Sequence, residues 1–322
     1  MLTLSGAAGR LSRIPDIEIQ LEAQLKQHTR FGIGGPADLL VDAPDEDSFA
    51  QVIQILRESD IPLVIIGGGS NLVVADGGFR GAVVRYTAAR LSATGNMVTA
   101  EAGAVLQHLV DFTIDLGLSG IHTMTGIPGW VGGAVYGNAG AYGRSIDQSI
   151  TKVRFFDGLA AREISNTDCK FRYRESIFKT NKHWVVFSTE LCLDAADSVA
   201  LRQKATGILD IRNAKYPPTM RCAGSIFKNL IFAELPPSVQ QQVPPKLIQG
   251  GKVPSAFFLE AVGAKGIRNG DIHVADYHAN LIYNAGHGTA QQVREVIFDL
   301  KARVTSRFGF ALEEEVQYVG FQ

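Results

Sequence analysis

The sequence predicts an α+β fold, in which helices and short strands do not repeat as regular β-α-β units. Stretches with helical apolar spacing are mixed with short apolar runs that are typical of strands. None of the 34 glycines falls in the G-x-G-x-x-G spacing of a Rossmann nucleotide fold or in the spacing of a P-loop. These observations favour a mixed fold over a doubly wound parallel sheet.

Apolar residues recur at helical spacing in four stretches, and each of them predicts a helix. These stretches are residues 46–59, 106–117, 198–215 and 289–308. The last has Thr289 as an N-cap and Gly309 as its terminator, and two prolines at 217 and 218 stop the third. Helices with such clear ends anchor the rest of the assignment.

Short apolar runs predict strands between these helices. In chain order they are 63–66, 72–74, 82–86, 97–100, 153–156, 184–193, 281–283 and 313–319. We expect an N-terminal extension over residues 1–27, a first domain over 28–197 and a second over 198–322.

Composition excludes several classes of function. The net charge of −1 gives no electrostatic reason to expect a nucleic acid or a membrane surface as partner. Charged residues interrupt the N-terminal region, so no signal peptide is expected, and no apolar run approaches the ~20 residues of a membrane span. Cys169, Cys192 and Cys222 are widely spaced, which indicates a reducing compartment without disulfides or a zinc site. We therefore expect a cytoplasmic protein with no bound metal.

Two glycine-rich segments are the most informative feature of the chain. Seven of the 18 residues from Gly126 to Gly143 are glycine, which is too dense for the interior of a helix or strand. The segment is also too apolar for a linker. The other glycine-rich segment, Gly67–Asn71, comes first in the chain and follows an apolar run. Bare backbone N–H groups attract phosphate, so the pair predicts a cofactor with a pyrophosphate; tight turns in a β-rich domain are the alternative.

Three further segments carry side chains with possible chemistry. In 171–176, Arg172 and Arg174 would face one side of an extended segment and offer forks for carboxylate or phosphate; a solvated edge strand is the alternative. In 222–229, Ser225 could be a nucleophile, a proton donor or part of a turn. Residues 313–315 are all glutamate, and Glu313 and Glu315 would share one face of a strand. They could be acid/base groups, or they could belong to a solvated strand end.

Taken together, these segments resemble the UDP-N-acetylenolpyruvoylglucosamine reductase family. The matching stretches run in family order over about residues 28–320: 28–37, 67–71, 126–143, 173–176, 224–229 and 313–316. The resemblance implies an FAD-binding domain of the vanillyl-alcohol-oxidase (PCMH) type over residues 28–197. A smaller α+β substrate-binding domain would follow over 198–322.

The resemblance also implies the reaction. NADPH would reduce noncovalently bound FAD and NADP⁺ would leave, and UDP-N-acetylglucosamine enolpyruvate would then be reduced to UDP-N-acetylmuramate. Such an oxidoreductase is a cytoplasmic flavoprotein of peptidoglycan synthesis and cell wall biogenesis, and so contributes to cell shape, cell division and the cell cycle. Its partners would be small molecules, with no nucleic acid and no membrane insertion.

The family's motifs assign roles to residues of this chain. Arg174 and Glu315 would stabilise the negative charge that develops on the substrate, and a glutamate can donate a hydrogen bond there only if it carries its proton. Ser225 would protonate the carbanionic carbon. Substrate or nicotinamide nucleotide would contact Lys215, Lys228 and Asn229. FAD would contact Gly67, Gly68, Gly69, Ser70, Asn71, Gly126, Ile127, Pro128, Gly132, Gly133, Asn138 and Ala139.

The chain departs from the family pattern at a few peripheral positions. Leu230 stands where proline is usual, Glu314 separates the two terminal glutamates where proline is frequent, and Glu175 replaces a frequent aspartate. No tyrosine-bearing insertion is evident between residues 185 and 215, which indicates the subclass that lacks this substrate-clamping loop. Two other functions compete: an FAD-dependent oxidase of the same superfamily, and a flavin-binding scaffold without catalysis. The retained set of Arg174, Ser225 and Glu315 argues against the scaffold.

Overall fold

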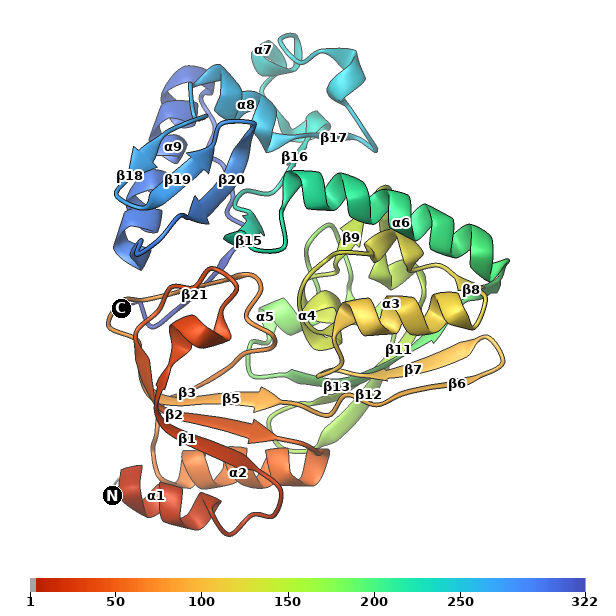
Figure 1. Ribbon diagram of the computed structural model, residues 1–322, viewed down its shortest axis with the longest axis vertical. Coiled ribbons are helices and arrows are strands. Elements are labelled where there is room, and N and C mark those ends of the chain that lie inside the picture. Colours follow the sequence, from red (N-terminus) through yellow and green to blue (C-terminus); the bar gives the residue numbers. More distant parts are fainter. Residues whose placement is uncertain (1–3, 322) are drawn as a thin grey trace. The chain divides into compact units, whose positions relative to one another are not determined.

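The computed structural model describes residues 4–321, which form two compact units (Figure 1). The first unit contains residues 4–23, 37–68 and 80–214, and the second contains 24–36, 69–79 and 215–321. The units are therefore interleaved along the chain, whereas three consecutive segments were expected. Residues 4–23 pack into the first unit, with Ala7 and Leu11 fully buried, and do not form a separate extension.

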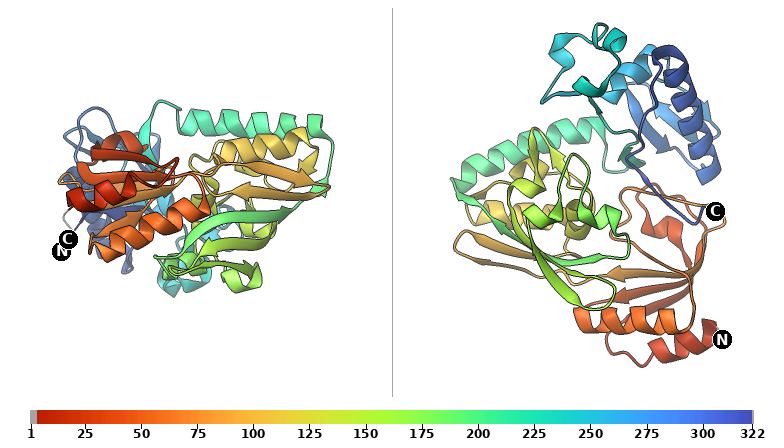
Figure 2. Two further views of the ribbon diagram at one scale, coloured as in Figure 1. Left: turned by 90° about the horizontal axis from the view of Figure 1, so that it is seen from below. Right: turned by 180° about the vertical axis from the view of Figure 1, so that it is seen from behind.

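One sheet of the first unit has the strand order β1-β2-β5-β3. Its strands are β1 (Glu18–Gln24), β2 (Pro36–Ala43), β5 (Phe79–Tyr86) and β3 (Leu63–Ile65). Helix α2 (Glu46–Glu58) runs along one face of this sheet beside α1 (Leu4–Leu11), as Figures 1 and 2 show. Asp45 and Ser48 form a capping box that starts α2, and the ring of Phe49 meets Phe187 edge to face in the core.

The second sheet of this unit is antiparallel, with the order β12-β11-β13-β7-β6. Its strands are β12 (Ala161–Ser165), β11 (Ile150–Phe156), β13 (Val185–Cys192), β7 (Met97–Glu101) and β6 (Leu91–Thr94). Helices α3 (Leu106–Asp115) and α6 (Ser198–Lys215) lie side by side (Figure 1). The smaller elements are β8 (Leu118–Ser119), α4 (Val131–Tyr136), β9 (Gly140–Ala141), β10 (Arg144–Ser145), α5 (Ile177–Thr180), β14 (Asp194–Ala195), and the 3₁₀ turns His122–Met124, Ile146–Gln148 and Thr167–Cys169.

The second unit is built on an antiparallel sheet with the order β15-β20-β19-β18. Its strands are β15 (Arg221–Ser225), β20 (His278–Asn284), β19 (Ile272–Ala275) and β18 (Arg268–Asn269). Helices α8 (Ser255–Ala261) and α9 (Ala290–Phe308) pack on it and bury Phe258 and Leu300. The remaining elements are β4 (Leu72–Val74) parallel to β21 (Gln317–Val319), β16 (Leu230–Ile231) paired with β17 (Lys252–Val253), α7 (Pro237–Gln240), and the 3₁₀ turns Leu25–His28, Phe232–Glu234 and Pro245–Leu247.

The four predicted helices are confirmed, and the predicted strands are confirmed except for part of the last one. All four helices are present, and the mixed order of helices and strands confirms the α+β class. The predicted final strand is wrong over residues 313–316, because β21 begins at Gln317. The backbone of Glu313–Glu315 instead bonds to residues 226–228 beside an isolated bridge between Phe227 and Glu314. None of the helices within residues 4–321 has the length and apolarity that crossing a bilayer requires.

The N-terminus of α9 provides a test of local stability. Thr289 Oγ1 accepts the N–H of Gln292 (3.1 Å), and Gln292 Oε1 accepts the N–H of Thr289 (3.0 Å). Loss of such a cap typically costs about 1 kcal/mol. We therefore expect Thr289→Ala to lower the free energy of unfolding by about 1 kcal/mol in denaturant titrations. Thr206→Ala is the control, since its hydroxyl bonds inside helix α6 and caps nothing. Equal effects of both changes would contradict the role of the cap.

Candidate functional site

The two glycine-rich segments meet at the indole ring of Trp130. A Cβ atom on Gly68 would lie 2.8 Å from Trp130 Cδ1, so this close approach requires glycine. The guanidinium carbon of Arg85 lies 5.6 Å from the centroid of the same ring. Arg85 is itself fixed by Asp42, with 2.6 Å between Nε and Oδ1. The structure thus brings Gly67 and Gly68 against the second glycine segment, a contact that the sequence analysis did not identify.

The second glycine segment contains a helix, contrary to expectation. Residues Val131–Tyr136 form α4, although glycine disfavours helices. The N–H groups of Val131 and Gly132 bond to the carbonyls of Ala104 (2.8 Å) and Ala102 (2.9 Å). A Cβ atom on Gly132 would lie 2.9 Å from that of Ala102. Helix α4 therefore needs glycine in order to pack against the segment around Ala102 and Ala104. This packing outweighs the low helix propensity of glycine.

Asn138 and Ala139 follow α4 in a tight turn. Asn138 is 3% exposed and has a φ of 42°, a conformation that asparagine tolerates better than most residues. Its Nδ2 donates to the carbonyl of Arg172 (2.9 Å), and its Oδ1 accepts the N–H of Asp147 (3.3 Å). The N–H of Ala139 bonds to the carbonyl of Ala134 (2.8 Å). The side chain of Asn138 thus connects the glycine segment to the loop that carries Arg174.

Arg174 lies in a tight turn, so the prediction of an extended segment with both arginines on one side is wrong. Arg172 and Glu175 exchange two backbone hydrogen bonds (3.0 and 3.1 Å), which places Arg174 at the tip with a φ of 57°. Arg174 Nη2 donates to the carbonyl of Gly140 (3.1 Å), and Lys179 Nζ donates to the backbone carbonyl of Arg174 (2.8 Å). A left-handed φ in a residue other than glycine costs about 1–3 kcal/mol and is typical of functional sites.

Unsatisfied polar atoms lie just before Gly126. Within residues 4–321, His122 Nδ1 and Thr123 Oγ1 are buried and have no hydrogen-bond partner. Burial, followed by the positive charges of Lys204 and Arg144, holds the pKa of His122 below its usual range, so its ring is neutral. The N–H of Gly126 donates to Gln107 Oε1 (2.7 Å). Buried polar atoms of this kind need a partner, which water or a bound polar group can provide.

Ser225 stands at a break in the second unit's sheet. Strand β15 pairs with β20 through Cys222, after which the register shifts and Ser225 pairs with Leu281. Gly224 absorbs this bulge with a φ of 79°. The Oγ of Ser225 lies 3.1 Å from Tyr216 Oη. The serine is therefore presented by a bulge and held by a tyrosine that sequence analysis did not single out.

The chain after Ser225 is fixed by Asn280 on β20. Asn280 Oδ1 accepts the N–H of Phe227 (2.9 Å), and its Nδ2 donates to the carbonyl of the same residue (2.8 Å). Asn280 is 3% exposed and also donates to Ser255 Oγ (2.8 Å). Nearby, Asn229 Oδ1 accepts the N–H of Ser255 at 3.4 Å. The buried side-chain amide of Asn280 therefore holds the Ser225–Asn229 segment in place.

The terminal glutamates lie directly beside this segment. The N–H of Glu315 donates to the carbonyl of Ile226 (2.7 Å), and the N–H of Lys228 donates to the carbonyl of Glu313 (2.9 Å). Asn71 Nδ2 donates to the carbonyl of Glu315 (2.9 Å), so the end of the glycine-rich segment Gly67–Asn71 joins the same cluster. The second unit thus brings together three motifs that are separated by up to 244 residues in sequence.

The side chains of these motifs point to different partners. The amine of Lys228, a residue that is 8% exposed, forms an ion pair with Glu313. Glu314 turns to Lys301, with 2.7 Å between Nζ and Oε1. The Nζ of Lys215 lies 5.1 Å from the ring centroid of Tyr216. Lys215 and Lys228 therefore provide two cations in the unit that carries Ser225.

The predicted site residues are divided between the two units. The first unit contains Gly67, Gly68, Gly126, Ile127, Pro128, Gly132, Gly133, Asn138, Ala139 and Arg174. The second unit contains Gly69, Ser70, Asn71, Lys215, Ser225, Lys228, Asn229 and Glu315. Within residues 4–321, no three histidine, cysteine, aspartate or glutamate side chains are grouped so that they could hold a metal ion.

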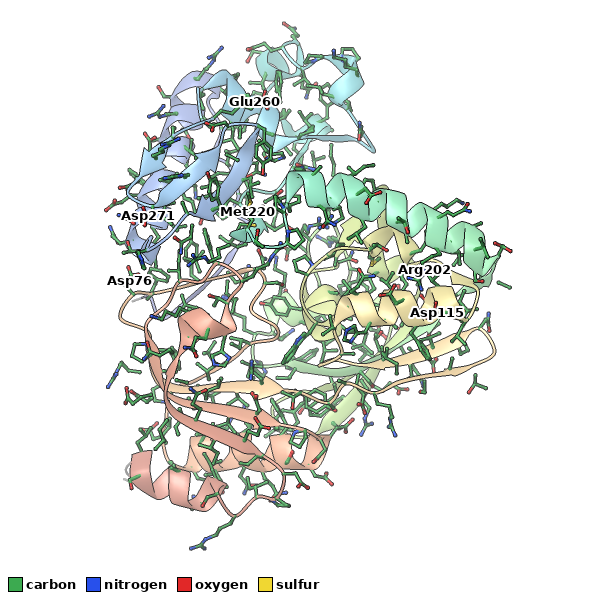
Figure 3. The ribbon with its side chains drawn as sticks, viewed as in Figure 1. Asp76, Asp115, Arg202, Met220, Glu260 and Asp271 are labelled. Atoms are coloured by element: carbon green, nitrogen blue, oxygen red, sulfur yellow. The ribbon has the colours of Figure 1, made fainter. Side chains whose placement is uncertain are left out.

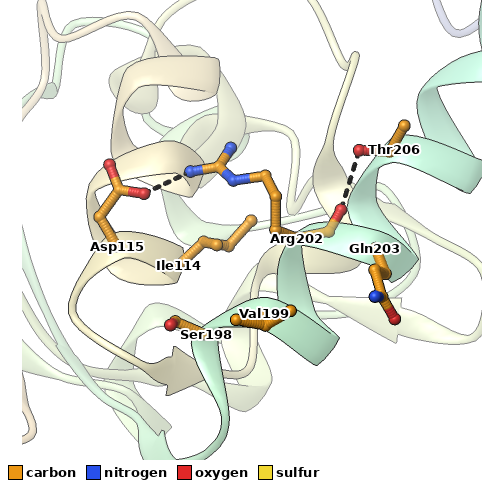
Figure 4. A pocket seen from close by; sticks show the side chains of 7 residues that line it. All are labelled: Ile114, Asp115, Ser198, Val199, Arg202, Gln203 and Thr206. Atoms are coloured by element: carbon orange, nitrogen blue, oxygen red, sulfur yellow. Dashed lines mark hydrogen bonds and ion pairs between the residues drawn. The ribbon is translucent and has the colours of Figure 1, made fainter.

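A surface cavity of about 530 Å³ between α3 and α6 contains none of these residues. Figure 3 shows Asp115 and Arg202 beside each other at this place, and Figure 4 shows the lining at close range. Arg202 Nη2 pairs with Asp115 (2.5 Å), and Arg202 also pairs with Asp111. Thr206 donates to the carbonyl of Arg202 (2.9 Å). The cavity is a groove between two helices that are joined by ion pairs.

Comparison with known proteins decides the family. Residues 37–159 match the model of an FAD-binding domain, and residues 216–319 match that of the C-terminal domain of UDP-N-acetylenolpyruvoylglucosamine reductase. The reductase of Solibacter usitatus is 56% identical over 311 residues, which are 97% of this chain and 100% of that protein. The chain belongs to the UDP-N-acetylenolpyruvoylglucosamine reductase family.

Other members of the reductase family support this assignment. The reductase of Syntrophus aciditrophicus is 34% identical over 309 residues, which are 94% of this chain and 92% of that protein. The crystal structure of the reductase from Thermus caldophilus superposes with a TM-score of 0.72 at 27% identity and covers 94% of this chain and 98% of that chain. The expected α+β fold, with an FAD-binding domain before a C-terminal reductase domain, is confirmed.

The first unit offers features that suit the FAD of a reductase. The buried polar atoms of His122 and Thr123 lie shortly before Gly126 and have no partner within residues 4–321. Unsatisfied polar atoms next to a glycine-rich backbone suit a cofactor that carries a pyrophosphate. The residues present therefore fit FAD.

Proposed function

We propose that this protein catalyses the NADPH-dependent reduction of UDP-N-acetylglucosamine enolpyruvate to UDP-N-acetylmuramate, with noncovalently bound FAD. The observation that carries the proposal is the 56% identity to a reductase over almost the whole chain. FAD held along the glycine segments would supply the hydride-transfer chemistry between NADPH and the enolpyruvyl double bond. The reaction belongs to peptidoglycan precursor synthesis.

FAD contacts are proposed along both glycine segments. They comprise Gly67, Gly68, Gly69, Ser70, Asn71, Gly126, Ile127, Pro128, Gly132, Gly133, Asn138 and Ala139. At Gly68 the indole of Trp130 occupies the space of the missing side chain. The backbone N–H groups of the glycine segments are proposed to contact the pyrophosphate. At Gly69 a Cβ atom would lie 1.9 Å from the carbonyl oxygen of His28, so this turn excludes any side chain.

Ser225 is proposed as the proton donor to the carbon that becomes carbanionic. Its hydroxyl is presented by the β15 bulge, and the rigid contact of Asn280 with Phe227 limits movement of the following chain. A positioned general acid contributes about 10²–10⁴-fold to a reaction rate. Because a serine hydroxyl is a weak acid, its neighbours must favour loss of its proton, and Lys215, Lys228 and Asn229 are the candidates.

Arg174 and Glu315 are proposed to stabilise the negative charge that spreads onto the substrate's carboxylate. The strained turn at Arg174 supports this role, since such a φ persists only where the surroundings enforce it. Glu315 must carry its proton in order to donate a hydrogen bond to an anion. Lys215, Lys228 and Asn229 would also bind the substrate or the nicotinamide nucleotide.

Several finer statements belong to the same proposal. The protein would act in the cytoplasm and contribute through peptidoglycan to cell wall biogenesis, cell shape, cell division and the cell cycle. It would belong to the reductase subclass without the substrate-clamping tyrosine loop. Residues 28–197 would bind FAD and residues 198–322 the substrate. Its partners would be small molecules, with neither nucleic acid nor membrane involved.

Product analysis tests the activity. The protein, NADPH and UDP-N-acetylglucosamine enolpyruvate are mixed under nitrogen, and UDP-N-acetylmuramate is quantified by mass spectrometry. We expect product to accumulate in proportion to the NADPH consumed. If NADPH is consumed only when oxygen is admitted, and no product forms, the protein is an oxidase and the proposal is wrong.

Substitution of Gly68 tests the proposed FAD site. In Gly68→Ala, the new Cβ would lie 2.8 Å from Trp130, so the indole must move toward its other neighbours. Overpacking of this kind costs about 1–3 kcal/mol of folding stability, and we expect the displaced indole to weaken FAD binding as well. Fluorescence titration of the apoprotein with FAD measures the change. Gly77→Ala is the matched control, because nothing lies within 4 Å of its new methyl group. Unchanged affinity in Gly68→Ala would contradict the proposed site.

A further inference from the structure

The hydroxyl of Tyr216 is a close neighbour of Ser225 that the family's motifs do not assign. The two oxygen atoms lie 3.1 Å apart, within hydrogen-bonding distance. Tyr216 stands directly after α6 and before Pro217, whereas Ser225 ends β15. The contact therefore joins the residue before Pro217 to the bulge that presents the serine.

Tyr216 is held firmly from several sides. The carbonyl of the preceding residue, Lys215, accepts a hydrogen bond from Tyr277 Oη (2.9 Å). The Tyr216 ring packs on the ring of His278 with 6.3 Å between centroids, and it belongs to a small cluster around the buried residues Cys222 and Leu281. Such packing limits the ring to one place, so its hydroxyl has a defined position relative to Ser225.

His278 does not provide an alternative acid in this cluster. Burial, followed by the positive charge of Lys215, lowers the pKa of His278 to about 4, so the imidazole is neutral near pH 7. Its Nδ1 accepts the N–H of Asn280 (3.2 Å), which assigns this nitrogen the role of acceptor. The hydroxyl of Tyr216 lies within hydrogen-bonding distance of Ser225 Oγ.

We propose that Tyr216 is a positioning residue for Ser225, and that its hydroxyl donates a hydrogen bond to Ser225 Oγ. This inference rests on the proposed role of Ser225 as the proton donor. A donor on Oγ occupies one of its lone pairs and leaves the serine's own hydrogen free to point to the substrate. It also stabilises the negative charge on Oγ as the proton leaves, which makes the serine a stronger acid.

The proton balance of the step is simple. The Ser225 O–H bond breaks, the proton forms a C–H bond at the carbanionic carbon, and the electron pair of the O–H bond stays on Ser225 Oγ. Tyr216 keeps its proton throughout and shares it in the hydrogen bond. Ser225 regains a proton from water after the product leaves, so Tyr216 is not consumed.

Tyr216→Phe removes the hydroxyl and keeps the ring that packs on His278. Stopped-flow absorbance follows two half-reactions: bleaching of the flavin by NADPH, and return of its colour on addition of the enolpyruvyl substrate. We expect an unchanged rate of bleaching and a return of colour that is slower by about 10–100-fold, the effect of a lost hydrogen bond to a charged group. Tyr283→Phe is the matched control, because its hydroxyl contacts His273 (3.4 Å) in the same sheet.

A double variant shows whether Tyr216 acts through Ser225. In the Ser225→Ala background, Tyr216→Phe should cause no further slowing. Additional slowing there, or equal slowing of bleaching, would show a merely structural role and overturn the inference. If Ser225→Ala is slow but Tyr216→Phe matches the wild type, only the inference is wrong. If Ser225→Ala itself regains its colour at the wild-type rate, the proposed proton donor is wrong, and the inference with it.

Discussion

Ser225→Ala is expected to keep its FAD and to be bleached by NADPH at the wild-type rate, yet to form UDP-N-acetylmuramate about 10²–10⁴-fold more slowly. The change removes one oxygen at the end of β15, where a bulge and Gly224 set the backbone independently of the side chain. Binding of FAD should not change, because the proposed FAD contacts lie on the glycine segments. The measurement is product formation together with the flavin spectrum.

The control for this experiment is Ser238→Ala, an exposed serine in α7 of the same unit. It should match the wild type in both half-reactions. Normal turnover by Ser225→Ala would show that another group or water donates the proton. Loss of FAD in Ser225→Ala would instead show that the serine supports the cofactor, which is not what the proposal states.

Glu315 is expected to give the second largest effect. Glu315→Ala removes a donor to the developing anion and should slow substrate reduction by about 10²–10³-fold. Glu315→Gln keeps an N–H donor at nearly the same place without any need for a protonated carboxyl, so most of the rate should return. Both variants should fold, because the structure holds this residue through its backbone, by Ile226 and Asn71.

The rate of flavin re-oxidation by substrate is measured in single-turnover experiments and compared between Glu315→Ala and Glu315→Gln. Glu234→Gln, an exposed position in the same unit, controls for the loss of one negative charge. If Glu315→Gln is as slow as Glu315→Ala, the site needs a carboxylate and the proposed role as a hydrogen-bond donor is wrong.

Helices with local end signals were predictable from the sequence. Thr289 and Gly309 bound α9 as expected, because capping depends on residues within one turn of the helix. Helix α4 was not predictable, since its glycines are required by the approach to Ala102, which is distant in sequence. The turn at Arg174 has no glycine to signal it, and its backbone pairing is visible only in the folded chain.

In the candidate site, too, the sequence motifs identified residues but not the contacts between residues that are far apart in the chain. The family motifs named Ser225 and Glu315, but their adjacency depends on backbone bonds between residues 226–228 and 313–315. Tyr216 carried no motif signal, and its contact with Ser225 is visible only in the folded chain. Trp130 was visible as part of the glycine segment, although its contact with Gly68 was not. Interleaving of the two units likewise depends on long-range packing.

The most direct test of the proposed function is the visible spectrum of the purified protein, recorded under nitrogen. The spectrum is taken first alone, then after NADPH, and finally after UDP-N-acetylglucosamine enolpyruvate. The proposal predicts a yellow protein that bleaches with NADPH and regains its colour only with the enolpyruvyl substrate. A colourless protein that takes up no added FAD, or a reduced protein whose colour returns only when air is admitted, would contradict it.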